Sequence, residues 1–382
     1  MTGGGARGAY QAGVLKRMGE IKAYKHRPIP FQILAGASAG AINVTALATR
    51  AKDFSQITRL LAALWARLSI EKVYRTDLGS LAPKAARWIR DLALGGVLGG
   101  GRADSLLDAS PLQHFLARRL HFSGIQESID QGHLYALAIT ATDYFSGKAY
   151  TFIQGQKGHP TWQKSRRVAL PSQISLQHVC ASSAIPILFQ PILVPTDDGP
   201  AYFGDGCLRL HAPLSPAIRL GAHRIMAIGV RSQVADENRK TSQSKATRPP
   251  IAQVLGVALN AIFLDSLDSD VEHLERMNSI LSSIKEKYGA LPKVDEPMDI
   301  IETLALKPSL DLAEVADTYS SKLPMTLRYF LDGLGTSRSE TADLISYLLF
   351  DSNYTRALIE LGYQDAQSRI DEIEEFLAKD KK

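Results

Sequence analysis

The sequence segment best suited to chemistry is a serine set between small residues, Gly36-Ala37-Ser38-Ala39-Gly40. It matches G-x-S-x-G, a pattern in which a sharp strand-to-helix turn exposes a nucleophilic serine. An apolar run at residues 31–34 precedes it, and residues 41–50 have helical character. Small residues at 36 and 40 let the strand and the helix approach closely. The helix N-terminus favours the negative charge that develops during acyl transfer. This context predicts that Ser38 is a nucleophile, not the inert serine of an ordinary turn.

A glycine-rich segment, Gly3-Gly4-Gly5-Ala6-Arg7-Gly8, precedes a predicted helix at residues 9–24. Such a segment presents several backbone N–H groups in one direction, which suits an oxyanion or a phosphate. Its glycines also satisfy G-x-G-x-x-G, but the strand that follows lacks the acidic residue expected for a dinucleotide ribose. No Gly-Lys-Ser/Thr follows either, so a P-loop is excluded. We favour an oxyanion loop over a dinucleotide site.

A third segment, Phe203-Gly204-Asp205-Gly206, places an aspartate between glycines. Alone, this pattern commonly indicates only a turn, and it gains weight from the other two segments. A hydrolase triad also needs a histidine. The candidates after Asp205 are His211, His223 and His273, and none lies in a distinctive loop, so the evidence for a catalytic histidine is poor.

The elements that must position these residues follow an α/β pattern. Strand-like segments at residues 31–34, 134–142, 149–153 and 224–230 alternate with helical ones, and the second and third predict a hairpin. We predict an α/β domain at residues 1–235, a polar linker at 236–250 and a mainly helical region at 251–382. That region begins with a helical apolar stripe at residues 251–263, which extends toward Gly289. A strand near residues 298–307 is expected to return to the sheet.

The composition indicates a globular protein. Of 382 residues, 45% are hydrophobic and 22% are charged, which excludes disordered, collagenous and disulfide-dense classes. The net charge of +5 is compatible with an anionic membrane surface but too small to imply nucleic acid. Two cysteines, Cys180 and Cys207, form at most one bridge and favour a reducing compartment. No apolar run reaches transmembrane length. We expect a cytoplasmic protein, leaving open peripheral contact with the inner membrane and a signal encoded upstream.

Taken in this order, the three segments resemble the bacterial patatin-like phospholipase family. The resemblance covers most of residues 1–235 and includes Cys180-Ala181-Ser182-Ser183-Ala184-Ile185-Pro186 and Phe189-Gln190-Pro191. It implies a three-layer α/β fold with a mostly parallel central sheet flanked by helices, plus a mainly helical C-terminal extension. The implied activity is lipid acyl hydrolysis of the phospholipase A or lysophospholipase type, without cofactor or metal.

The family also implies roles for individual residues. Its serine–aspartate dyad makes Ser38 the nucleophile and Asp205 the general base, which removes the need for a histidine. The implied oxyanion hole is formed by amides of Gly3, Gly4, Gly5 and Ala39. Supporting residues are Arg7, Gly8, Gly36, Gly40 and Gly206. Arg7 either holds the loop or meets an anionic headgroup, and the sequence does not decide.

Two features depart from the family pattern. An apolar strand usually precedes the glycine loop, whereas only Met1 and Thr2 do so here, so the first strand is expected to be missing or truncated. Cys207 stands where the family usually has glycine or alanine.

The sequence leaves two points undecided: whether the protein contacts a membrane, and whether water or another molecule accepts the acyl group. Residues 92–101 are apolar and glycine-rich and follow Lys84, Arg87 and Arg90, so they form either a lid that touches lipid or a loop folded over the core. The stripe at 251–263 favours core or domain interface, because acidic residues follow it. The expected partner is a lipid or phospholipid, not nucleic acid, and the oligomeric state is not specified. There are two alternatives: an acyltransferase or thioesterase with the same dyad, and a catalytically silent lipid-binding or interaction protein.

Overall fold

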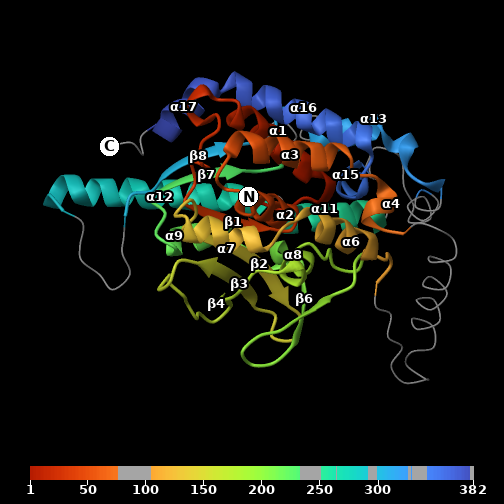
Figure 1. Cartoon of the computed structure of the whole chain (residues 1–382), viewed down its shortest axis with the longest axis horizontal. Coiled ribbons are helices and arrows are strands. Elements are labelled where there is room, and N and C mark those ends of the chain that lie inside the picture. Colours follow the sequence, from red (N-terminus) through yellow and green to blue (C-terminus); the bar gives the residue numbers. More distant parts are fainter. Residues whose placement is uncertain are drawn as a thin grey trace.

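The computed structural model describes residues 1–75, 105–232, 251–263, 265–290, 299–325, 328 and 342–378. Within them it confirms the expected α/β architecture, with a central sheet, flanking helices and a helical C-terminal region (Figure 1). The strands are β1 (Ile33–Ala37), β2 (Ala136–Asp143), β3 (Ala149–Gly155), β4 (Arg167–Pro171), β5 (Ile192–Val194), β6 (Ala201–Gly204), β7 (Arg224–Ile228) and β8 (Glu302–Leu306).

Helices precede, separate and follow these strands. Up to β7 they are α1 (Gly8–Gly19), α2 (Ala39–Ala48), α3 (Phe54–Ala66), α4 (Ile70–Val73), α6 (Ser110–Arg119), α7 (Ser123–Asp130), α8 (Leu176–Ser182) and α9 (Ser215–Arg219). The later ones are α11 (Ile251–Phe263), α12 (Asp265–Tyr288), α13 (Leu312–Thr318), α15 (Ala342–Leu348), α16 (Ser352–Ser368) and α17 (Ile370–Ala378). Short 3₁₀ turns are η1 (Gly5–Arg7), η2 (Lys22–Tyr24), η3 (Gly206–Leu208) and η4 (Ser320–Lys322).

Strand β2 is the centre of a six-stranded sheet. The order is β4-β3-β2-β6-β5, and β1 pairs with β2 off this path. The β1–β2 and β3–β4 pairs are parallel, whereas β2–β3, β2–β6 and β5–β6 are antiparallel. The predicted hairpin is therefore confirmed as β2 and β3. Every residue of β2 is buried, as its unbroken run of Ala, Leu, Ile and Thr requires.

The strand expected near residues 298–307 forms as β8, but it does not join the six-stranded sheet. It pairs in parallel with β7 along its whole length, and the two make a separate two-stranded sheet. A small hydrophobic cluster that includes Ile225, Leu267 and Ile301 packs around this pair. Strand β8 thus pairs with the edge of β7 and not with a strand of the six-stranded sheet.

The first two residues connect the two sheets. The Met1 amino group donates to Ala35 O at 2.7 Å, and the Ala37 N–H donates to Met1 O at 3.3 Å, as a parallel strand neighbour would. The side-chain amide of Gln11 donates to the carbonyls of both Thr2 and Ile228. Met1 and Thr2 therefore lie between β1 and β7, where Figure 1 marks the N-terminus, and they anchor the glycine loop that follows.

The C-terminal helices share the core of the first 230 residues. Helix α16 packs along α1, and both lie above α2 and the sheet in Figure 1. Contact is closest at two glycines, because a Cβ on Gly13 would meet the Ile359 carbonyl and one on Gly362 would meet the Tyr10 carbonyl. One hydrophobic cluster includes residues of both regions, among them Tyr10, Leu358 and Leu377.

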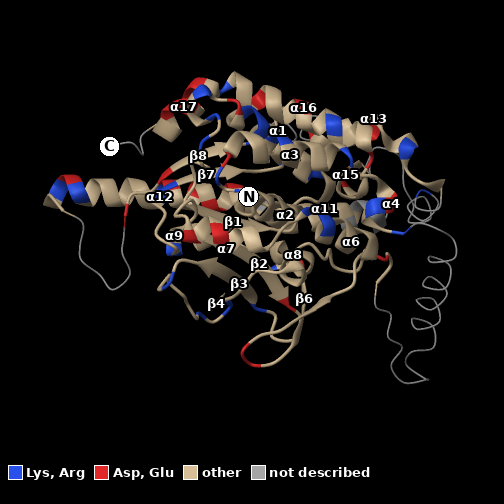
Figure 2. Ribbon diagram, viewed as in Figure 1, with Lys and Arg blue, Asp and Glu red and all other residues tan. Residues whose placement is uncertain are grey.

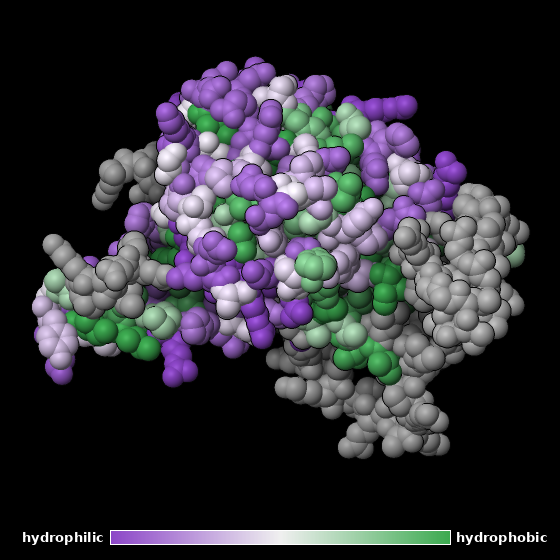
Figure 3. All heavy atoms as spheres, turned by 90° about the horizontal axis from the view of Figure 1, so that it is seen from below, coloured by the Kyte–Doolittle hydropathy of each residue, from purple (hydrophilic) through white to green (hydrophobic). Residues whose placement is uncertain are grey.

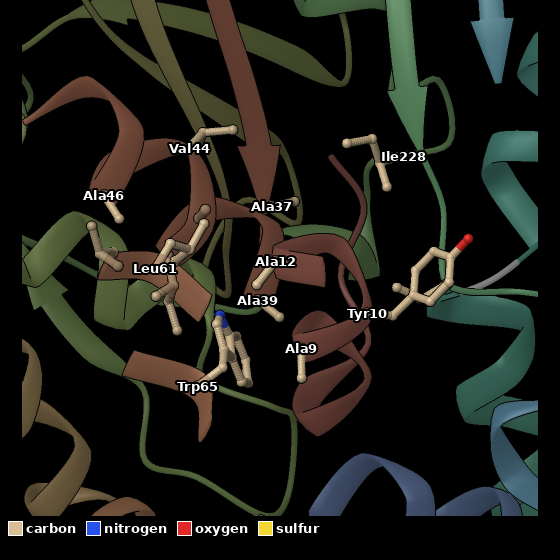
Figure 4. Close-up of a cluster of buried hydrophobic side chains, with 14 of the residues drawn as sticks. Ala9, Tyr10, Ala12, Ala37, Ala39, Val44, Ala46, Leu61, Trp65 and Ile228 are labelled. Carbon is tan, nitrogen blue, oxygen red and sulfur yellow. The ribbon is translucent and has the colours of Figure 1, made fainter. Parts of the chain in front are cut away.

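Helix α2 is buried along its whole length, which explains why its sequence, AGAINVTALA, is apolar apart from Asn43 and Thr45. The Trp65 indole packs beside Ala39 and Ala9 (Figure 4), and its N–H donates to Asn43 Oδ1 at 2.7 Å. A bonded polar residue inside an apolar helix fixes the rotation of that helix. The Trp65–Asn43 bond therefore helps to orient α2 against α3.

Seen from below, hydrophilic residues cover much of the surface and hydrophobic ones gather in smaller areas (Figure 3). None of the helices among the described residues combines the length and hydropathy needed to cross a bilayer. Helix α11 forms where the apolar stripe was expected, but the stripe is buried only in part: Leu259 and Phe263 lie in the core, whereas Val254 is 56% exposed. The predicted lid at residues 92–101 and the linker at 236–250 lie outside the described residues.

Candidate active site

Ser38 occupies the turn between β1 and α2 in a strained backbone conformation. Its φ is 54° and its ψ is −128°, a combination that L-residues rarely adopt, and it is the N-cap of α2. A Cβ on Gly36 would lie 2.6 Å from Gly40 O, and one on Gly40 would collide with the Met1 carbonyl. Glycine is needed at both positions for strand and helix to approach, as the motif predicts. The geometry is that of a nucleophile elbow.

Ser182, at the end of α8, holds this turn in place. Its hydroxyl accepts the Ser38 N–H at 3.0 Å and donates to Thr140 O on β2 at 2.6 Å. The Ser38 amide is thus tied to the central strand through one fully buried side chain. Sequence reasoning gave Ser182 no role, although it lies in the 180–186 segment that carries part of the family resemblance.

Asp205 follows β6 and is completely buried. Its N–H donates to Ala184 O at 2.9 Å, its carbonyl accepts from the Thr142 hydroxyl at 2.8 Å, and its Oδ1 accepts the Cys207 N–H at 2.9 Å. A Cβ on Gly206 would collide with the Thr140 carbonyl, so only glycine lets this turn pack against β2. Main-chain bonds therefore fix the aspartate in one orientation.

The structure brings Asp205 and Ser38 together from distant parts of the chain. Burial raises the pKa of Asp205 to about 7, and hydrogen bonding from Ser38 and Cys207 partly offsets that rise. Its Oδ2 has no partner of ordinary hydrogen-bond geometry among the described residues. The Ser38 hydroxyl thus lies close enough to lower the pKa of the carboxyl, but its hydrogen bond to Asp205 is longer or less well aligned than an ordinary one. Such geometry is common before substrate binds. An acceptor oxygen beside a serine in a buried site is the arrangement that a general base requires.

Cys207 and Gly3 lie beside Ser38 and Asp205. A Cβ on Gly3 would lie 2.6 Å from both Ser38 Cβ and Cys207 Sγ, so the loop touches both residues. Burial and the charge of Asp205 raise the pKa of Cys207 well above its ordinary value, while a hydrogen bond from the Gly3 N–H lowers it. Cys207 is free and buried. Its thiol links the aspartate to the glycine loop, a contact that the sequence did not predict.

The glycine loop lies over Ser38 in a conformation that requires glycine. Gly4 has φ 150° and Gly5 has φ 55°, and a Cβ on Gly5 would collide with the Tyr347 carbonyl. Within the described chain, the N–H groups of Gly4, Gly5 and Ala39 donate to no other residue. Gly5 and Ala39 line the same pocket as Ser38. Donors without partners beside a nucleophile are suited to an oxyanion.

Arg7 is a structural residue and does not face a headgroup. It is 2% exposed, its Nε donates to Ser346 Oγ at 2.8 Å, and its Nη2 pairs with Asp343 at 3.2 Å. The guanidinium also lies 4.5 Å from the centre of the Tyr347 ring. All three partners belong to α15. The glycine loop is therefore fastened to the C-terminal region, which decides the question that the sequence left open.

An apolar slot opens beside Ser38. Its cavity volume is about 20 Å³, room for little more than one water molecule. Nearly all of its walls are hydrocarbon, contributed by Ile42, Leu64, Trp65, Leu68, Leu112, Phe115, Leu116, Ile185, Phe189 and Phe350. Such a lining suits an alkyl chain, and admitting one requires the walls to move apart.

None of the nine histidines, all of which lie in described segments, is hydrogen-bonded to Ser38 or Asp205. His211, His223 and His273 are exposed on the surface. Tyr144 is the unpredicted neighbour of the aspartate: burial and the Asp205 charge raise its pKa to about 12. The residues around the dyad thus offer a carboxylate, not an imidazole, to Ser38.

The sequence model of the family described as Patatin-like phospholipase matches residues 1–218, more than half of the chain. That range contains the glycine loop, the Ser38 elbow and Asp205. A search of curated proteins found no match. The chain therefore belongs to the patatin-like phospholipase family.

Proposed function

We propose that the protein hydrolyses acyl esters of phospholipids or lysophospholipids with a Ser38–Asp205 dyad. The observation that carries the proposal is the buried Asp205 carboxylate, with one oxygen unpartnered among the described residues, beside the strained Ser38. Family membership supports lipid esters as the substrate class. The described residues offer no histidine to replace Asp205 as the base.

The acylation step follows from this arrangement. Asp205 accepts the proton of the Ser38 hydroxyl while Oγ forms a bond to the ester carbonyl carbon. Negative charge then develops on the carbonyl oxygen, where the N–H groups of Gly4, Gly5 and Ala39 stabilise it together with the N-terminus of α2. The Gly3 N–H, also expected in the oxyanion hole, is bonded to Cys207 instead. When the carbon–oxygen bond to the alcohol breaks, the departing oxygen takes the proton from Asp205. The acyl group is left on Ser38.

Deacylation repeats these roles with water. Asp205 accepts a proton from a water molecule, whose oxygen attacks the acyl carbon. Collapse of the second tetrahedral intermediate breaks the bond to Ser38 Oγ, which regains its proton from Asp205. Fatty acid and alcohol are released, and the base ends in its starting state.

The apolar slot favours a hydrocarbon acyl group. It begins at Ser38 and runs between α3 and α6 through Leu64, Leu68 and Phe115. Burying each methylene of a chain there contributes about 0.8 kcal/mol. Because the slot is narrow, part of this gain is spent on moving its walls apart. Long-chain esters should therefore bind more tightly than short-chain esters only once α3 and α6 have moved apart.

Transfer to an acceptor other than water is the second candidate, supported by one observation. Ser38 is 1% exposed and its slot is nearly free of polar atoms, so few water molecules reach the acyl group. Adding glycerol or a lysophospholipid during turnover distinguishes the two outcomes. Hydrolysis releases fatty acid in proportion to substrate, whereas transfer yields a new ester at its expense.

Replacing the dyad residues tests the proposal. With lysophospholipid and with a short-chain ester, Ser38→Ala and Asp205→Asn should each lower turnover by about 10³-fold or more. Ser183→Ala is the matched control, because Ser183 lines the same slot but its hydroxyl donates to Val179 O at 2.8 Å. That variant should stay within a few-fold of the parent protein. Parent-like turnover by Ser38→Ala would overturn the dyad.

A further inference from the structure

A second cavity, larger than the slot, lies at the far end of α2 from Ser38. Its volume is about 1070 Å³, and α3, α4, α6 and the start of α16 form its walls together with the end of α2. We call it the basic groove, because six of its lining residues are cations and one is an acid, Glu71. The cations are Arg50, Arg67, Lys72, Arg118, Arg119 and Arg356.

The charge of the basic groove is not neutralised within the described structure. All six cations are exposed, and none forms an ion pair with a described carboxylate. Figure 2 shows blue segments around α4 and α6 on this side of the molecule. Like charges gathered in one concavity raise the local potential and attract anions from solution. The groove is thus electrostatically suited to an anionic partner.

The same groove has apolar walls that continue into the slot. Leu64, Leu68 and Phe115 line both cavities, and Leu60, 45% exposed, adds to the groove alone. The Arg119 guanidinium lies 5.7 Å from the centre of the Phe115 ring, so charge and hydrocarbon meet at this point. A partner that matches both features carries anionic groups at one level and apolar chains directly behind them. A phospholipid surface has this order.

We propose that the basic groove docks the protein on an anionic phospholipid bilayer. Headgroup phosphates lie against the arginines, and the outer end of the slot faces the lipid. The ten residues of α2 separate the groove from Ser38 by about 15 Å at 1.5 Å per residue. An acyl chain bound at Ser38 and directed along the slot therefore points toward the docked surface. The docking step itself does not depend on the dyad chemistry.

Flotation with vesicles of ether-linked lipids tests this docking, since such lipids contain no acyl ester and hydrolysis plays no part. Vesicles of phosphatidylcholine alone are compared with vesicles that contain one-third phosphatidylglycerol, at low and at high salt. We expect binding to the anionic vesicles only, and its loss at high salt. The variant R67Q/R118Q/R356Q should lower the partition coefficient by about 100-fold, because each basic residue at an anionic surface contributes roughly a factor of five.

The matched control removes three exposed cations from α12, at the opposite end of the molecule from α4 and α6 in Figure 1. R276Q/K285Q/K287Q changes the net charge equally and should leave the partition coefficient within two-fold. Unchanged thermal midpoints show that both variants fold. Equal losses in the two variants would overturn the proposal in favour of net charge alone. Binding of duplex DNA that only the groove variant loses, without vesicle binding, would overturn it in favour of nucleic acid.

Discussion

The backbone of Ser38, the proposed nucleophile, is strained. A non-glycine residue at φ 54° and ψ −128° costs of order 1–3 kcal/mol and persists because surrounding bonds hold it. Here those bonds are the Ser182 hydroxyl on its amide and the first turn of α2 on its carbonyl. The same bonds fix the orientation that the proposed nucleophile needs.

This strain predicts an inverted order of stability between two inactive variants. Ser38→Gly relieves the strain, whereas Ser38→Ala keeps it. The flexibility of glycine in the unfolded chain costs only about 0.4–1 kcal/mol. Chemical denaturation should therefore find Ser38→Gly more stable than Ser38→Ala by up to about 2 kcal/mol. A less stable glycine variant, the usual result at helix starts, would show that the turn is relaxed.

The raised pKa of Asp205 predicts how activity depends on pH. A general base must be deprotonated, and burial raises the pKa of this carboxyl to about 7. The value of kcat/KM for a soluble ester should therefore rise with pH, reach half of its plateau near pH 7 and level off above that. An acidic limb near the ordinary carboxyl value of about 4 would contradict the buried base.

The same shift predicts a pH-dependent change in stability. At pH values below the ordinary carboxyl pKa of 3.8, Asp205 is protonated in both the folded and the unfolded chain, so folding buries no charge there. Between 3.8 and about 7 the unfolded chain releases it first, so folding loses up to about 4 kcal/mol as the pH rises. Asp205→Asn removes this loss. Its stability relative to the parent protein should increase from pH 4 to pH 7 and stay constant above; a pH-independent difference would contradict the buried charge.

At the scale of elements, α1 and α16 approach so closely that side chains are excluded at two points. Gly13→Ala would place a Cβ against the Ile359 carbonyl, a backbone atom that cannot rotate away. We expect a loss of about 1–3 kcal/mol in the free energy of unfolding. Gly256→Ala on α11 is the control, because its Cβ would lie 3.6 Å from the nearest atom, ordinary contact. It should be neutral or stabilising, and equal effects would contradict the close packing.

Local elements were predictable from the sequence where one stretch of residues determines the structure. The G-x-S-x-G turn, the β2–β3 hairpin and α11 depend on neighbouring residues, and all three form as expected. The partner of β8 was not predictable, because strand pairing depends on which ladder stands open in three dimensions. Arg7 shows the same limit: its partners, Asp343 and Ser346, lie more than 300 residues away and carry no motif.

The candidate site divides in the same way. The motifs identified Ser38 and Asp205, but their proximity depends on β1, β2 and β6 lying side by side. Ser182 and Cys207 act through contacts that no local pattern encodes. The sequence therefore identifies the two candidate reactive groups, but not the residues that orient them.

At the scale of the whole molecule, the proposed function assigns the acyl chain to the slot between α3 and α6. Leu64→Trp adds bulk at the junction of slot and groove, away from the dyad. We expect kcat/KM for a long-chain ester to fall by at least tenfold relative to a short-chain ester. Leu60→Trp, which lines only the groove, is the control and should leave this ratio unchanged. Equal losses for both chain lengths would indicate a general packing defect.

Labelling with a fluorophosphonate tests whether Asp205 and the fold activate Ser38. These reagents form a covalent bond with activated serines and largely ignore ordinary ones. We predict rapid labelling of the parent protein, none of Ser38→Ala, and labelling slowed by about 10²-fold or more in Asp205→Asn. Labelling of Ser38→Ala at the parent rate, or no labelling of the folded parent protein, would contradict the account.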